Sequence, residues 1–261
     1  MATRAARNSP LTAYVLHRYD WSESSLILDV FTREQGRIAV AAKGAKRPFS
    51  QLRSVLLPFQ RIHIFLGRQA AGDVTREVQT LRGADWTGGA AMLTGAALFS
   101  GFYVNELVMK LLARHDPHPV LFDAYSAAVA GLGAEGEANA QAVLRAFEIM
   151  LLKEIGLLAE LGIETTTRRP VVAAGRYRLH ADAGVVSEPG TAEATASGAT
   201  LLALQAALDA GDFASLRDAA AASLAELRPL LRAQLHYHLG TDRLRTRQVM
   251  IEAQALTSST P

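Results

Sequence analysis

Apolar side chains alternate along the first third of this chain, and this period of two constrains the fold more than any other feature of the sequence. In segment 25–32, Leu26, Leu28 and Val30 fall on one face of an extended chain, and their neighbours fall on the other. Similar alternation recurs in four further segments: 12–19, 37–44, 60–67 and 74–82. The front of the chain is therefore predicted to form five β-strands.

The order of these segments favours a small barrel. The turn at 33–36 joins the second and third strands into a hairpin closed at a glycine. Between the third and fourth strands, segment 48–59 has room for a helical turn or two bounded by Pro48 and Pro58. Five antiparallel strands with a helix between strands three and four are the plan of an OB-fold barrel.

After Trp86 the period changes to that of a helix. Apolar residues then recur at i, i+3, i+4 and i+7, which places them on one helix face: Val104, Leu107, Val108 and Leu111. Further helices are predicted over 120–132, over 140–161 and from Thr200 onward.

One part of the second half departs from this helical pattern. Segment 163–192 loses the period, carries Pro170 and Pro189 with several glycines, and is predicted to be an irregular or short β insert. The chain is therefore predicted to be a multidomain α+β protein, with an OB-fold barrel in residues 1–85 and an α-helical domain with the insert in residues 86–261.

Composition sets further limits. Hydrophobic residues make up 49% of the chain, enough for a sizeable core, and the opening MATRAARNSP lacks the apolar segment of a secretory signal. The most apolar region, 96–113, contains Asn105, Glu106 and Lys110 and is too polar for a membrane span. A cytoplasmic protein without membrane contact is expected. The chain has no cysteine, which excludes disulfides and thiolate metal sites, so we expect no cofactor.

Charge is distributed unevenly along the chain. Residues 1–85 carry 13 basic and 7 acidic side chains, a net charge of +6, whereas the remaining residues carry 14 and 18, a net charge of −4. Within the front half, residues 36–72 contain no acidic side chain and seven basic ones: Arg37, Lys43, Lys46, Arg47, Arg53, Arg61 and Arg68. This one-sided stretch indicates a negatively charged partner.

The loop KGAKRPFSQLR, residues 43–53, allows two interpretations. In the first, four cations bind phosphates and Phe49 stacks on an exposed base. In the second, the loop is a solvated surface and Phe49 is buried. Both stay open from the residues alone, although Phe49 by itself is expected in the core rather than on the surface.

No catalytic constellation is present. The chain lacks the phosphate-loop, dinucleotide-binding and nucleophile-elbow motifs, and its histidine clusters HDPH and HYH lack acidic or thiol companions at metal-site spacing. We therefore expect a protein that is not an enzyme. In the helical half, Lys110, Arg114 and Arg145 lie near apolar residues and could receive an acidic, hydrophobic peptide end.

Several segments together resemble one family. Residues 14–47, YVLHRYDWSESSLILDVFTREQGRIAVAAKGAKR, are similar to the N-terminal signature of the RecO family of bacterial DNA repair proteins, which contains W-S-E-S-S, L-D-V-F-T and V-A-K-G-A-[KR]. GFYVNELVMKLL and LRAFEIMLLKEIG resemble motifs of its helical domain, and HYHLGTDRLRTRQVM resembles its C-terminal helix. The motifs occur in order over most of residues 11–162.

This resemblance implies a recombination mediator at the nucleoid. It implies an OB-fold that binds single- and double-stranded DNA, and a helical domain that takes the acidic C-terminal tail of single-stranded DNA-binding protein (SSB). Such proteins anneal complementary strands and, with RecR and sometimes RecF, help load RecA onto coated single strands. On matching positions, DNA contacts are expected at Arg37, Lys43, Lys46, Arg47 and Arg53. Arg145 matches a basic position suited to the SSB tail, with Lys110 and Arg114 as further candidates.

The sequence departs from the family at the insert. Many members hold zinc there with four cysteines, whereas segment 163–192 contains none, so zinc is not expected. The insert must then be held by packing and hydrogen bonds.

Two other classes of function compete with DNA annealing. The first is an adaptor that docks acidic partner tails without binding DNA directly. The second, a nuclease or other enzyme, is disfavoured because the sequence shows no clustered metal site.

Overall fold

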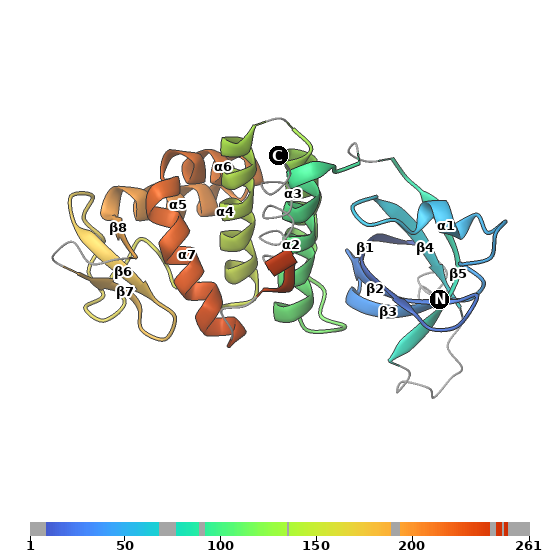
Figure 1. Ribbon diagram of the computed structural model, residues 1–261. Helices are drawn as coiled ribbons and strands as arrows, with labels where there is room; N and C mark the ends of the chain where they lie inside the picture. The colour runs from blue at the N-terminus through green and yellow to red at the C-terminus, as the bar shows by residue number, and fades with distance from the viewer. Residues whose placement is uncertain are drawn as a thin grey trace. The chain divides into compact units, whose positions relative to one another are not determined.

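A computed structural model describes residues 9–67, 77–88, 92–134, 136–188, 194–240, 244–246 and 248–249 (Figure 1). The start of the predicted strand 74–82 and Arg68 lie outside the described residues. Contacts divide the chain into two compact units. The first takes residues up to Gly95 together with Asn105–Gly133, and the second takes Ala96–Val104 and the residues from Ala134 onward. The boundary between the units lies within a single helix, so the division predicted after residue 85 stays a prediction.

The first unit begins with a closed five-stranded barrel. Its strands are β1 (Leu11–Asp20), β2 (Leu26–Thr32), β3 (Gly36–Ala42), β4 (Ile62–Leu66) and β5 (Val78–Trp86), and they close in the order β1-β2-β3-β5-β4. Leu28 and Val30 are fully buried in its core, as the alternation predicted. The pair β3–β5 is parallel, so the sheet is mixed and the prediction of an entirely antiparallel barrel is wrong at this pair.

The predicted helical turn between strands three and four is α1 (Leu52–Val55), and Leu56 at its end is fully buried in the barrel core. Two longer helices follow the barrel, α2 (Gly95–Leu111) and α3 (Pro119–Leu132). α3 begins with a proline at its first position, where the missing N–H has no intrahelical partner to lose.

Aromatic side chains attach α3 to the outer face of the barrel within the first unit. The ring centroid of Phe31 lies 5.3 Å from that of Phe122 and 5.9 Å from that of Tyr125, and Tyr14 lies 4.9 Å from Tyr125. The Tyr125 hydroxyl donates to Asn105 Oδ1 at 2.6 Å. Burial holds the pKa of Tyr125 well above its ordinary value, so this hydroxyl stays a donor. α3 thus covers this part of the barrel surface.

Besides the start of α2, the described residues of the second unit form several helices. They are α4 (Glu137–Glu154), α5 (Gly198–Ala210), α6 (Phe213–Ala222) and α7 (Leu224–Leu239), and α4 packs against α6 and α7 (Figure 1). α4 ends earlier than the predicted helix 140–161 because Gly156 has a φ of +74°. The Gly156 and Leu157 amides donate to the carbonyls of Lys153 and Leu152, a Schellman arrangement that closes the helix.

Two short strands lie within the predicted insert 163–192, which confirms the prediction of short β structure, and a third strand just beyond it completes a three-stranded sheet. Its strands are β6 (Arg176–His180), β7 (Gly184–Ser187) and β8 (Thr195–Ser197), in the order β7-β6-β8. Glu226 of α7 holds this sheet: its carboxylate accepts from Arg176 Nη1 at 2.9 Å, from the Ser197 amide at 3.0 Å and from Thr200 Oγ1 at 2.7 Å. A hydrogen-bonded carboxylate therefore joins a cysteine-free insert to the helices.

The described residues show neither a metal-binding cluster nor a membrane-spanning helix. They contain no cluster of three or more His, Cys, Asp or Glu side chains that could hold a metal ion, and the absence of zinc stays a prediction. No helix within these ranges is long and apolar enough to cross a membrane.

Candidate nucleic-acid interface and peptide pocket

Two loops meet at one end of the barrel. The loop 21–25 follows β1, and the loop 43–51 follows β3. The Lys46 amide donates to the Ser24 carbonyl at 3.0 Å, and the Gly44 amide donates to Ser25 Oγ at 3.3 Å. Gly44 has a φ of +72°, a conformation that glycine adopts without strain. These bonds join the two loops into one surface, which we call the loop face, defined by residues 19–25 and 43–53.

Four of the five predicted DNA-binding cations lie on the loop face. Lys43, Arg47 and Arg53 are exposed, and Arg53 belongs to α1. Lys46 is half-buried, with its Nζ 3.0 Å from Asp20 Oδ1. Because Asp20 is itself exposed, this ion pair is open to water and contributes little to stability. A phosphate can therefore replace Asp20 as the partner of Lys46 at small cost.

Aromatic side chains stand among these cations. Phe49 is 99% exposed, so the expectation that it belongs to the core is wrong. The reason lies in the loop, which buries Ala45 at 1% exposure and then leaves the barrel before it reaches Phe49. On the neighbouring loop, Trp21 is 55% exposed and Tyr19 is 47% exposed. An exposed aromatic ring costs free energy in water, and such rings beside cations are typical of surfaces that stack on bases.

Arg37 does not belong to the loop face. It donates from Nε and Nη2 to the two carboxylate oxygens of Asp29, at 2.9 and 2.8 Å, and Asp29 is only 1% exposed. Its Nη1 bonds the carbonyls of Met109 and Leu112, the latter at 3.2 Å. Arg37 thus fastens the barrel to the end of α2, a role that the sequence reading missed. The alternation in segment 25–32 places Asp29 on the face of β2 opposite the barrel core. This was the sequence feature that could have pointed to an outward-facing carboxylate as a partner for Arg37.

The three predicted SSB-tail cations are divided between the two units. Arg114 donates from Nη2 to Asp29 Oδ2 at 3.2 Å, and Lys110 Nζ lies 3.3 Å from Glu106 Oε1 one helical turn away. Both belong to the first unit, whereas Arg145 belongs to the second. The structure therefore gives Arg145 a different setting from the other two.

Arg145 lines a pocket of about 250 Å³ in the second unit. The walls come from α2, α4, α7 and the segment after α7, and they combine apolar side chains with cations: Phe99, Tyr103, Leu144, Arg145, Arg232, Leu235, His236 and Leu244. Sequence reasoning found Arg145 but missed Arg232 and His236, because no short spacing relates α7 to α4. Apolar walls with two guanidinium groups suit an apolar peptide end that carries carboxylates.

The buried Glu148 pairs with Arg145, and the half-buried Tyr103 bonds to Glu148 in turn. Arg145 Nη2 lies 2.7 Å from Glu148 Oε1, and Tyr103 donates its hydroxyl proton to the same oxygen at 2.7 Å. Glu148 has no exposed surface, and burial raises its pKa although Arg145 and the Tyr103 hydrogen bond oppose that rise.

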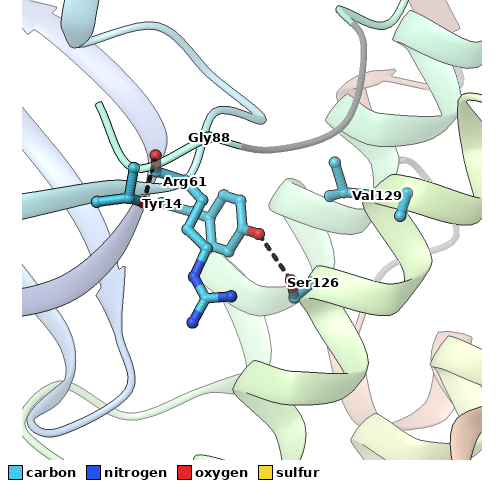
Figure 2. A pocket seen from close by; sticks show the side chains of 7 residues that line it. Tyr14, Arg61, Gly88, Ser126 and Val129 are labelled. Carbon is cyan, nitrogen blue, oxygen red and sulfur yellow. Dashed lines mark hydrogen bonds between the residues drawn. The ribbon is translucent and has the colours of Figure 1, made fainter.

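A smaller cleft of about 150 Å³ lies in the first unit (Figure 2). Tyr14 and Ser126 share a hydrogen bond of 2.8 Å between their hydroxyl oxygens, and Figure 2 shows the Arg61 side chain beside the Tyr14 ring. Thr87 Oγ1 donates to the Arg61 carbonyl at 3.0 Å. Arg61 is one of the basic residues of the acid-free stretch, but it lies just before β4 and outside the loop face.

Comparison with known proteins covers nearly the whole chain. Residues 8–87 match the family model "Recombination protein O N terminal", and residues 92–248 match "Recombination protein O C terminal". The chain is 51% identical over 259 residues to a "DNA repair protein RecO" of Polaromonas sp. (strain JS666), covering 98% of this chain and all of the relative. It is 53% identical over 262 residues to a protein of the same name from Variovorax paradoxus, covering 97% and 99% of the two chains.

Proposed function

The chain belongs to the RecO family of DNA repair and recombination proteins, and from that premise we propose that it binds single- and double-stranded DNA and anneals complementary strands. The observation that carries this proposal is the loop face. There the exposed Phe49 stands in a short segment with four cations: Lys43, Lys46, Arg47 and Arg53.

The loop face has the chemistry that annealing requires. Two strands repel each other through their phosphates, and clustered Lys and Arg side chains neutralise that repulsion by releasing counterions. Cations that contact phosphates leave base edges free to pair, and exposed rings hold single-stranded bases without reading their sequence. No acid, base or metal takes part, so the proposed activity is not enzymatic.

The pocket around Arg145 supports a second part of the proposal. We infer that it takes the acidic C-terminal tail of SSB, and that the protein acts with RecR, and sometimes RecF, to load RecA onto SSB-coated single strands in the cytoplasm. Arg145 and Arg232 would receive carboxylates while Phe99 and Leu235 pack against an apolar residue.

Strand annealing tests the proposal. Two complementary oligonucleotides with a donor and an acceptor fluorophore are mixed with and without the purified protein, and energy transfer is followed in time. The protein is expected to accelerate pairing of the complementary pair and to leave a non-complementary pair separate.

A peptide-binding measurement beside the annealing assay distinguishes annealing from an adaptor role. An adaptor would bind an acidic peptide in the pocket yet leave the annealing rate and single-strand binding unchanged. That combination would refute direct DNA binding while retaining the peptide pocket. Cleavage of the oligonucleotides in the presence of magnesium would point instead to a nuclease.

A further inference from the structure

The ion pair between Arg145 and Glu148 is buried to an unusual degree. The Glu148 side chain has no exposed surface, and the Arg145 side chain is 12% exposed. Among the described residues, Glu148 Oε2 and Arg145 Nε have no hydrogen-bond partner. A buried pair that is only partly satisfied gains little over an apolar pair of the same size, because both charges lose their hydration. A contribution to stability therefore does not explain why an ion pair is buried at this position.

The position of Arg145 offers a reason. Arg145 lines the peptide pocket, so its remaining N–H donors can reach a ligand there, while Glu148 balances its charge from behind. A carboxylate that enters the pocket brings a second negative charge close to Glu148. Two carboxylates that share one guanidinium repel each other, and this repulsion favours protonation of one of them.

We propose that Glu148 takes up a proton when an acidic peptide end binds this pocket. Protonated Glu148 no longer neutralises Arg145, so the guanidinium attracts the ligand more strongly. Binding therefore strengthens as the pH falls. This inference rests on the proposed binding of an acidic tail by the same pocket. Tyr103 and Glu148 are positioning residues for Arg145 in this scheme. Neutral Glu148 still presents an oxygen to Arg145, so the guanidinium keeps its place.

The sign of the pH dependence follows from proton counting. The complex binds more protons than the free protein. The affinity therefore rises as the pH falls through the interval between the pKa of Glu148 in the complex and its pKa in the free protein. Burial already raises the pKa of Glu148 in the free protein, and this moves the interval toward neutral pH. One linked proton changes the affinity by at most about tenfold per pH unit.

Further titratable and charged groups lie on the helices that line this pocket or pack against α4. They include Tyr103 on α2, Arg145 on α4, Arg232, His236 and His238 on α7, and the pair Arg217–Asp218 on α6. His236 also lines the pocket, so the experiment removes its imidazole in every variant that is compared. Burial lowers the pKa of His238, and Arg217 and Asp218 pair with each other at 2.8 Å.

The test compares the full-length variants H236Q and H236Q/E148Q. A fluorescent synthetic peptide with several aspartates and an apolar carboxyl-terminal residue is titrated by anisotropy between about pH 8 and about pH 6. The H236Q protein is expected to bind at least about threefold more tightly at the lower pH. In H236Q/E148Q the affinity is expected to be independent of pH and tighter than that of H236Q at pH 8, because glutamine mimics the protonated acid. An equal pH dependence in both variants would overturn the proton linkage alone.

If E148Q disturbs folding, a second variant still tests the inference. The hydrogen bond from Tyr103 stabilises charged Glu148, so H236Q/Y103F should shift the midpoint of the affinity change to higher pH. A midpoint that stays fixed would contradict the role of Glu148. If the wild-type protein binds no peptide at any pH, the proposed tail pocket itself is refuted, whatever the variants do.

Discussion

Replacement of Lys43, Lys46 and Arg47 together by alanine should remove most of the salt dependence of single-strand binding. Arg37 is committed to Asp29, so of the five predicted DNA-binding cations only four are on the loop face, and Arg53 is the one left unchanged. At about 0.7 counterion per phosphate contact, four contacts give a slope of log affinity against log salt of roughly −2.8. The triple variant should show a slope of roughly −0.7.

The assay is fluorescence anisotropy of a labelled oligothymidine at a series of sodium chloride concentrations. A matched control replaces Arg33, Arg217 and Arg228 by alanine, which removes the same charge outside the loop face. Arg33 and Arg217 form ion pairs with Asp123 and Asp218 at 3.0 and 2.8 Å, and both pairs are open to water. Circular dichroism should show both variants folded, since every replaced side chain is exposed or half-buried.

Two results would refute the reasoning. If the slope of the loop-face variant equals that of the wild type, phosphates are bound elsewhere. If the control variant loses as much slope as the loop-face variant, binding depends on net charge and not on the arrangement of cations on this surface.

Three further predictions follow from single side chains. Phe49→Ala should weaken oligothymidine binding by about 1–3 kcal/mol, or roughly 5- to 150-fold. The melting temperature should not fall, because the ring is 99% exposed. An affinity within about twofold of wild type would exclude stacking. Arg37→Ala should lower the free energy of unfolding in urea by about 3 kcal/mol, because it leaves buried Asp29 with a weaker partner. The salt slope of DNA binding should stay unchanged. A loss of stability below about 1 kcal/mol would contradict the anchoring role. Burial tends to raise the pKa of Glu226, but hydrogen bonds from Ser197 and Thr200 and the charge of Arg176 outweigh it and lower the pKa below 4.5. The stabilisation by this carboxylate is therefore present above that pH and lost as the pH falls through the lowered value. The melting temperatures of wild type and Glu226→Gln should therefore converge in acid, and a difference that does not vary with pH would contradict this.

Burial separates the predicted DNA contacts that fit the proposal from the one that does not. Arg37 and Arg47 look alike in the sequence, as cations in one acid-free stretch. In the structure, Arg37 contacts a carboxylate that is 1% exposed, whereas Arg47 is exposed. An ion pair out of water is costly to break, so Arg37 is a poor candidate for exchange with phosphate.

The peptide pocket shows the same limit on sequence reasoning. Arg145 was identified through its position in a helical motif, and Glu148 follows it at a spacing of three residues, which places both on one helix face. Tyr103 and Arg232 lie 42 residues before and 87 residues after Arg145 in the chain. Only packing of α2, α4 and α7 within the second unit brings these side chains to one pocket.

Most strands and helices, and the charged and aromatic residues of the loop face, can be read from the sequence alone. Alternation at Leu28 and Val30 placed both in the barrel core, because side chains on a strand point to opposite faces in turn. Which polar and aromatic groups keep their contact with water depends on long-range packing, which buries Asp29 and Glu148 and leaves Phe49 in solvent. Solvent exposure depends on which distant segments pack over a residue, and the chemistry of these sites follows from that packing.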